Sequence, residues 1–287
     1  MKKAFILALC MMVAAAGFFF NMRNEVAEAA YTPVEESPLY ESPLYESIFP
    51  LTPIPRNMLT DTGYLKLVNR ELAMATPTAD TNIVSAWPTI PVRTMDITLH
   101  STALSAVSAL LAESCDTWEF FISSGHRSHA LQRELYENAT NRAYVLPPGH
   151  SEHELGLAAD ILVMGIPMSE MSGSAQMLWL TENAWQHGLI LRYPQGMEHI
   201  TGVAYEPWHF RYVGRVHAWY MYQNRMVLEQ YLEYLKEHGR LNISFDGVEY
   251  HVMYTQLADG NLHIPNGMQF NISVSNRGGY VVTAWAS

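Results

Sequence analysis

An acidic residue at the start of an apolar run places the strongest constraint on how this chain folds. Asp160 is followed at once by Ile161, Leu162 and Val163, and the stretch from Leu157 to Met164 has the length and composition of a buried strand. A carboxylate beside aliphatic side chains is costly to bury unless it is paired or binds a metal ion. His153 lies just upstream, so His153 and Asp160 are candidate metal ligands. A hydrogen-bonded structural His–Asp pair is the alternative interpretation.

The counts of cysteine and histidine decide which kinds of metal site remain open. With 2 Cys among 287 residues, the chain can form neither a disulfide scaffold nor a thiolate zinc cage, whereas its 12 His allow a site of nitrogen and oxygen ligands. The 17 Lys and Arg are outnumbered by 28 Asp and Glu, which gives a net charge of -11. A basic surface for a phosphate backbone is not expected, so we predict no nucleic-acid partner.

The N-terminal region has the pattern of an export signal. Two lysines precede an apolar run from Ala4 to Phe20, and the small residues Ala29 and Ala30 supply a cleavage site. We interpret residues 1–30 as a signal peptide or, alternatively, as an uncleaved anchor that would tether the protein to a membrane through residues 4–20. Both interpretations predict an extracytoplasmic protein, either secreted or held at the outer face of the cytoplasmic membrane.

The rest of the chain divides into three predicted parts. Residues 31–58 are rich in Pro, Glu, Ser and Tyr, and Glu-Ser-Pro-Leu-Tyr occurs there twice. Prolines at this spacing oppose both a helix and a central strand, so we predict an extended tether. Residues 59–239 are predicted to form the main domain. Residues 240–287 are predicted to form a small β-hairpin appendage, because Asp246-Gly247 and Asn276 to Gly279 are turn signals between alternating runs.

Strands and helices alternate in the predicted main domain. Apolar spacing and turn residues predict helices over Ser101–Glu113, from Ser128 onward, over Ser174–His187 and over Val216–His238. Strands are predicted at Trp118–Ile122, Leu157–Met164 and Leu189–Tyr193. This order is typical of an α+β or an α/β fold, and periodicity alone does not distinguish the two.

Glu206 and His209 form a second chemical cluster, in the sequence Glu-Pro-Trp-His. Pro207 keeps Glu206 out of a helical conformation, so the pair would meet a metal from a loop or an irregular strand. His209 would complete a shell of two His and one Asp, which leaves a fourth position open for water. Glu206 would then be the general base that takes a proton from that water.

A third cluster surrounds Arg127, in the sequence Ser-Gly-His-Arg-Ser with Gln132 downstream. A permanently charged guanidinium at the end of a strand can hold a substrate carboxylate or polarise a carbonyl. A surface arginine in a salt bridge is the alternative.

Taken in order, the three clusters resemble the VanY-type D-alanyl-D-alanine carboxypeptidases. These belong to a zinc metallopeptidase family that also contains VanX dipeptidases and lysostaphin-type endopeptidases. The resemblance runs from about Leu104 to Leu235 and implies an α+β fold, a small antiparallel sheet with flanking helices that carries a zinc site. His126 departs from the pattern, because the family usually has Tyr there, and this puts substrate fit in question.

The resemblance also implies a role for each motif residue. It implies that one zinc ion is bound by His153, Asp160 and His209. Glu206 matches the catalytic base and Arg127 the arginine that stabilises the oxyanion. The implied contacts to the terminal carboxylate of the substrate come from Arg127, Gln132 and Ser151.

The implied function is an exported zinc-dependent D-alanyl-D-alanine carboxypeptidase. It would remove the C-terminal D-Ala from peptidoglycan stem peptides, its partners, by metal-activated water with Glu206 as base. An L,D-carboxypeptidase acting on tetrapeptide stems and a D,D-dipeptidase are the nearest alternatives. The tether and the C-terminal β region favour a carboxypeptidase acting on a long polymer over a dipeptidase. A catalytically inactive wall-binding module is the alternative from another class, and the intact Glu206 and Arg127 argue against it.

Overall fold

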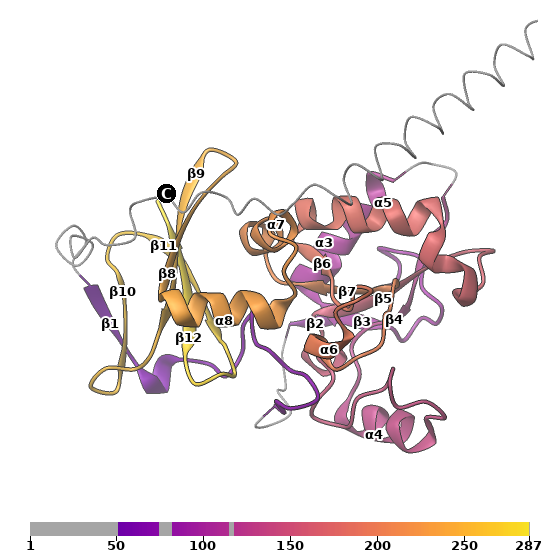
Figure 1. The fold of residues 1–287 in the computed structure, drawn as a ribbon, viewed down its shortest axis with the longest axis horizontal. Coiled ribbons are helices and arrows are strands. Elements are labelled where there is room, and N and C mark those ends of the chain that lie inside the picture. The colour runs from indigo at the N-terminus through magenta and orange to yellow at the C-terminus, as the bar shows by residue number, and fades with distance from the viewer. Residues whose placement is uncertain (1–50, 75–81, 115–117, 287) are drawn as a thin grey trace, which may run out of the picture. The chain divides into compact units, whose positions relative to one another are not determined.

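A four-stranded antiparallel sheet organises the part of the chain that carries the predicted site. The computed structural model describes residues 51–74, 82–114 and 118–286 (Figure 1). The sheet has the strand order β4-β5-β7-β6, with bounds β4 Phe120–Ser124, β5 Ala158–Val163, β6 Leu189–Leu191 and β7 His209–Tyr212. Each pairing in this sheet is antiparallel. The predicted α+β class is therefore confirmed, and a doubly wound parallel sheet is excluded.

Helices pack on this sheet and bury its inner strand. All 6 residues of β5 are buried. The helices α3 (Ser101–Ala112) and α5 (Ala175–Asn183) contribute Leu110 and Leu180 to the core cluster that contains Ile161 and Phe210 of the sheet. The strand predicted at Leu157–Met164 is thus confirmed, and its apolar run is explained by burial on both faces.

Two predicted helix ends are confirmed. The Ser128 hydroxyl accepts a hydrogen bond from Leu131 N at 3.1 Å and caps α4 (His129–Asn138). The helix predicted from Ser174 consists of α5 followed by the 3-10 helix η5 (Ala184–His187), and it stops at Gly188 with φ 79°. Glycine suits that left-handed position because it has no Cβ.

The single helix predicted over Val216–His238 is wrong. The structure has two helices there, α7 (Arg215–Gln223) and α8 (Leu228–His238). The break lies at Arg225, whose φ of 52° is left-handed, and Gln230 Oε1 then accepts from Val227 N at 3.1 Å at the start of α8. The sequence concealed this break because neither Gly nor Pro stands between Asn224 and Val227.

The C-terminal strands form a second antiparallel sheet, of order β11-β12-β9-β8. Its strands are β8 Arg240–Phe245, β9 Val248–Thr255, β11 Gln269–Val274 and β12 Tyr280–Trp285. Both predicted hairpin turns are confirmed: Asp246 and Gly247 have φ of 52° and 74°, as a type I′ turn requires, and Asn276 has φ 60°. The sheet shares a buried cluster with α7 and α8, which includes Ile243, Val252, Val281, Tyr231 and Leu235. The predicted appendage is therefore packed against the main domain through a common core.

The last residues of the predicted tether are folded. Strand β1 (Leu51–Pro55) pairs with β10 (Asn261–Pro265), and the 3-10 helix η2 (Arg56–Met58) follows it. Because β1 is an edge strand with one partner, its prolines interrupt no second ladder. Residues 1–50, which include the predicted signal and most of the predicted tether, lie outside the described residues. In the part that is described, no helix is long and apolar enough to span a bilayer.

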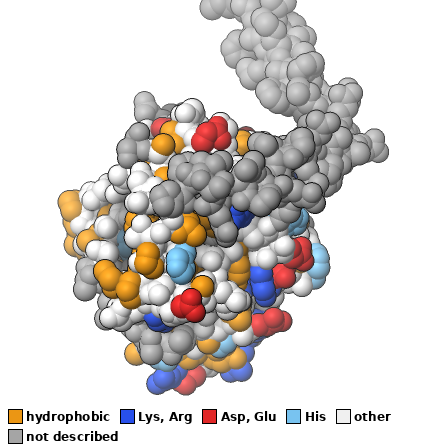
Figure 2. All heavy atoms as spheres, turned by 90° about the vertical axis from the view of Figure 1, so that its left-hand side faces the viewer, with side chains coloured by type: hydrophobic (Ala, Val, Ile, Leu, Met, Phe, Trp, Pro, Cys, Tyr) orange, Lys and Arg blue, Asp and Glu red, His pale blue; other side chains and the backbone are white. Residues whose placement is uncertain are grey.

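The remaining described elements are short. They are β2 Ile83–Ser85, β3 Thr98–His100, η3 Glu152–Leu155, η4 Met168–Gly173 and α6 Glu198–Thr201. Figure 2 shows the molecule from the side of β1 and β10, and on that face the Lys and Arg side chains are scattered singly among apolar, acidic and His side chains.

Candidate metal centre

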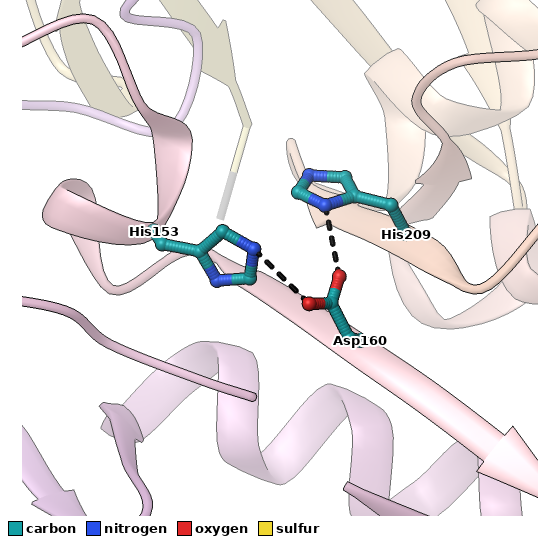
Figure 3. A group of neighbouring side chains, drawn as sticks. All are labelled: His153, Asp160 and His209. Carbon is teal, nitrogen blue, oxygen red and sulfur yellow. Dashed lines mark hydrogen bonds and ion pairs between the residues drawn. The ribbon is translucent and has the colours of Figure 1, made fainter. Parts of the chain in front are cut away.

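Three side chains from separate elements converge on one point. His153 comes from η3, Asp160 from β5 and His209 from the first position of β7. Their ligand atoms all lie within 4.8 Å of one another, and all three residues are buried. His153 Nε2 is 3.4 Å from Asp160 Oδ2, and His209 Nδ1 is 3.0 Å from Asp160 Oδ1 (Figure 3). Within the described residues this is the cluster of His, Cys, Asp and Glu side chains that could hold a metal ion.

Sheet register and one glycine bring these ligands together. Asp160 is directly opposite His209 in the β5–β7 ladder. His153 reaches the same point because Gly156, with φ 70°, turns the chain from η3 into β5. A Cβ at Gly156 would come within 2.4 Å of the Ile83 side chain. Glycine is needed here for two reasons: the backbone is left-handed, and there is no space for a Cβ atom.

His153 is held in the neutral form that a metal ligand requires. Its Nδ1 donates to the Gly125 carbonyl oxygen at 2.7 Å, so Nε2 is the atom that faces Asp160. Burial and the nearby Arg127 guanidinium lower the pKa of His153 to about 4. Its free nitrogen therefore carries a lone pair at neutral pH, as a metal ligand must.

His209 presents its other nitrogen to the same point. Its Nδ1 faces Asp160 Oδ1 at 3.0 Å and Glu206 Oε2 at 3.6 Å. Burial lowers the pKa of His209, but the carboxylates of Asp160, Glu152 and Glu206 together outweigh burial and raise that pKa to about 9. In the metal-free protein the imidazole is thus protonated at neutral pH, and a metal ion would take the place of the Nδ1 proton.

Glu206 lies beside the ligands in the loop before β7. Its backbone N–H donates to the Tyr193 carbonyl oxygen at 3.1 Å, and its side chain is buried. Burial raises the pKa of Glu206 to about 8, although His209 and Arg127 oppose the shift. A pKa near neutrality is what a general base requires, and a bound dication would lower this one further toward neutral pH.

Arg127 also belongs to the centre. Its Nη2 is 3.2 Å from Asp160 Oδ2, its Nε donates to Ser124 Oγ at 3.0 Å, and its Nη1 donates to Gln132 Oε1 at 3.3 Å. Gln132 is fixed in turn, because its Nε2 donates to the Leu146 carbonyl oxygen at 2.7 Å. Gln132 therefore orients the guanidinium, a role that the sequence did not suggest for it.

All seven predicted site residues line a single cavity of about 680 Å³. Ser151 is buried at its wall. The remaining wall is mixed: it has polar side chains from residues 134–141 and apolar side chains that include Tyr144, Leu146, Tyr193, Val203 and Trp208. A concave surface that combines apolar side chains with a few convergent polar groups is typical of small-ligand and peptide sites. His126 is not among the residues that line this cavity.

Sequence reasoning also missed a buried carboxylate behind the ligands. Glu152 Oε2 is 3.7 Å from His209 Nε2, and neither atom has a hydrogen-bond partner among the described residues. Burial raises the pKa of Glu152, but Arg192 and Arg211 outweigh it and hold that pKa well below its usual range. The only local signal was its position between Ser151 and His153, because both arginines come from distant strands or loops.

Comparison with known proteins agrees with this geometry. Residues 96–215 match the family VanY, D-alanyl-D-alanine carboxypeptidase. A mutant of the D,D-pentapeptidase VanY from the VanB-type resistance cassette, solved in complex with Zn(II), is 31% identical with a TM-score of 0.51. This chain covers 98% of that structure, which covers 59% of this chain. The chain belongs to the VanY family. The VanY match spans all seven predicted site residues.

Two other VanY relatives extend the comparison. The D-alanyl-D-alanine carboxypeptidase of Enterococcus faecium is 38% identical over 167 residues, which are 58% of this chain and 54% of that protein. This chain thus spans about half the length of that curated relative. The structure of the vancomycin-resistance D,D-dipeptidase VanXYg with a D-Ala-D-Ala phosphinate analogue is 25% identical with a TM-score of 0.71. It covers 82% of this chain, and this chain covers 98% of it.

The donor set fits zinc. Two imidazole nitrogens and one carboxylate are the three-ligand pattern of catalytic zinc sites, which keep a fourth position open. Metal-bound histidines usually donate their outer nitrogen to a carboxylate. The corresponding atom here, the buried His209 Nε2, lies 3.7 Å from the Glu152 carboxylate.

Proposed function

We propose that the protein is an exported zinc-dependent D-alanyl-D-alanine carboxypeptidase that removes the C-terminal D-Ala from peptidoglycan stem peptides. The observation that carries the proposal is the convergence of His153, Asp160 and His209 with Glu206 and Arg127 on one cavity. Export is supported by the basic and apolar N-terminal pattern of residues 1–30, which would direct the enzyme to the side of the membrane where peptidoglycan lies.

The chain supplies proton transfer and charge stabilisation. Zinc held by the three ligands provides a Lewis acid and lowers the pKa of water to about 7 from about 15.7. Glu206 lies on the Nδ1 side of His209, where its carboxylate can accept a proton from an attacking water and return it to the leaving amine. Arg127 stabilises the negative charge that develops on the carbonyl oxygen. Ser151 and Arg127 both line this cavity, which supports a role for them in binding the substrate's terminal carboxylate.

Replacing Arg127 with Lys is expected to lower kcat by about 10²- to 10³-fold, the usual cost of one lost oxyanion donor. Lysine keeps the charge but cannot make the forked contacts to Ser124, Gln132 and Asp160. Steady-state release of D-Ala from a pentapeptide measures the effect. The control is Arg133→Lys on the exposed face of α4, and equal rates for the two variants would contradict the role of Arg127.

Zinc affinity is expected to rise roughly tenfold per pH unit below about pH 9, because binding displaces one proton from His209. The sign follows from the raised pKa: the imidazole is protonated below about 9, so protons compete with the metal there and cease to compete above it. Chelator competition between pH 6 and 10 measures the slope. A flat affinity profile below pH 9 would show that His209 is already neutral in the metal-free protein.

A D,D-dipeptidase is the second candidate. The structural likeness to the D,D-dipeptidase VanXYg extends over 82% of the chain, against 59% for VanY. The presence of strands beyond the catalytic sheet therefore does not favour a carboxypeptidase over a dipeptidase, contrary to the sequence-based expectation.

One assay separates the candidates. The purified protein is incubated with pentapeptide, tetrapeptide and D-Ala-D-Ala, with and without a chelator, and D-Ala release is measured. Release from pentapeptide that the chelator abolishes is the expected result. Release chiefly from the dipeptide would establish the second candidate, and release chiefly from tetrapeptide would indicate an L,D-carboxypeptidase. Activity that survives the chelator would overturn the zinc mechanism.

A further inference from the structure

A buried network of two glutamates and two arginines lies behind His209. Glu152 Oε1 accepts a hydrogen bond from Arg192 Nε at 2.8 Å and is 2.9 Å from Arg211 Nη1. Arg192 also binds Glu229 through both terminal nitrogens, with Nη1 to Oε2 at 2.9 Å and Nη2 to Oε1 at 2.7 Å. All four side chains are buried. Two negative and two positive charges balance, so the network needs no charge from His209.

One oxygen of this network faces the metal centre. Oε1 of Glu152 is used by the arginines, whereas Oε2 is 3.7 Å from His209 Nε2, and both of these buried atoms have no hydrogen-bond partner among the described residues. On the other side of the ring, Nδ1 faces Asp160 and Glu206. A carboxylate can only accept, so the hydrogen on Nε2 has Glu152 as its acceptor once a metal ion takes the place of the proton on Nδ1.

The network reaches beyond the segment that matches the VanY family. Glu229 is in the first turn of α8, which follows residues 96–215, and its Oε1 accepts from Asn69 Nδ2 at 3.1 Å. Asn69 precedes that segment. The network that holds Glu152 therefore includes buried residues from before and after the segment that matches the VanY family.

We propose that Glu152 and Glu229 are positioning residues for the metal ligand His209. Glu152 holds the ring with its Nε2–H outward and its Nδ1 toward the metal position, and Glu229 fixes Glu152 through Arg192. The inference rests on the proposed function, because it takes His209 as a zinc ligand. It adds that α8 is required for tight zinc binding although it contributes no ligand.

The direct test is Glu152→Asp in the full chain. Aspartate keeps the charge that Arg192 and Arg211 require, but it is one methylene shorter and withdraws the carboxylate from His209. Zinc affinity, measured by competition with a colorimetric chelator, is expected to fall about 10- to 100-fold. At saturating zinc, kcat should fall while KM stays unchanged, because Glu152 lies behind the ligand and outside the cavity wall. A general loss of structure would instead lower the active fraction and leave the zinc affinity of that fraction intact.

Two matched variants of helix α8 test the role of Glu229. Glu229→Gln breaks the buried pair with Arg192 and is expected to weaken zinc binding about tenfold, at the lower end of the same range. Glu233→Gln on the same helix removes only the half-exposed ion pair with Arg277 and should leave zinc affinity unchanged. Circular dichroism at low temperature confirms that each variant is folded before titration.

The outcomes distinguish this inference from the proposed function. If the unaltered protein binds zinc tightly and both Glu152→Asp and Glu229→Gln have zinc affinities within twofold of it, the positioning role alone would be overturned. Failure of the unaltered protein to bind zinc would overturn both proposals. Weakened zinc binding in Glu152→Asp and Glu229→Gln, with Glu233→Gln unchanged, is the result that we expect.

Discussion

Replacing Glu206 with Gln is expected to lower kcat by about 10²- to 10⁴-fold, the usual contribution of a positioned general base. The amide has the same shape but cannot accept the proton. Zinc affinity should change much less, because Glu206 Oε2 lies 3.6 Å from His209 Nδ1 and is not one of the three ligands. Peptide hydrolysis and zinc titration on the same preparation measure the two effects.

The same substitution should not destabilise the metal-free protein near neutral pH. Burial raises the pKa of Glu206 from 4.5 to about 8. For a carboxyl whose pKa is raised on folding, the stabilisation is complete below the unfolded pKa and is lost as the pH rises toward the folded pKa. Glutamine stays neutral throughout, so the melting temperature of the variant should match the unaltered protein at pH 4 and exceed it at pH 8. A lower melting temperature at pH 8, or unchanged kcat, would contradict this account of Glu206.

Replacing Asp160 with Asn is expected to abolish activity, by on the order of 10³-fold or more, through loss of zinc. Asp160 is central to the candidate ligand set: its two oxygens contact His209 Nδ1, His153 Nε2 and Arg127 Nη2. Burial raises the pKa of Asp160, but the neighbouring His153 and His209 hold it well below its usual range. Without the carboxylate, the partly buried Arg127 and the buried His209 lose their partner, and the metal-free protein should lose about 3 kcal/mol of stability.

The control is Asp246→Asn, the same change at an exposed ion pair. Asp246 pairs with Arg215 Nη2 at 2.7 Å on the surface and occupies a turn with positive φ, a position that asparagine also favours. We expect a change in stability of less than about 1 kcal/mol and unaltered zinc binding. Denaturant unfolding and chelator competition compare the two variants. Equal zinc affinity in Asp160→Asn and the unaltered protein would remove Asp160 from the ligand set.

Much of the fold followed from local patterns. The inner strand around Asp160, the cap at Ser128 and the hairpin at Asp246-Gly247 were each predictable, because burial on both faces, side-chain capping and positive φ leave direct marks on the sequence. The break at Arg225 was not, because the apolar spacing of α7 and α8 continues through it and no Gly or Pro marks it. The pairing of β1 with β10 was likewise invisible, since it joins segments far apart in the chain.

Sequence patterns predicted which side chains would carry the chemistry. His153, Asp160, His209, Glu206 and Arg127 were identified from residue type, local order and motif resemblance, since ligand and base chemistry depend on functional groups that can be read directly. The way in which these side chains are held could be seen only in the three-dimensional contacts. The pairing of Asp160 with His209, the use of Gln132 to orient Arg127, and the placement of Glu152 against His209 depend on strand register and on partners such as Glu229. These contacts join residues that are distant in the chain. The burial of their charges depends on those distant partners, so the local sequence does not indicate it.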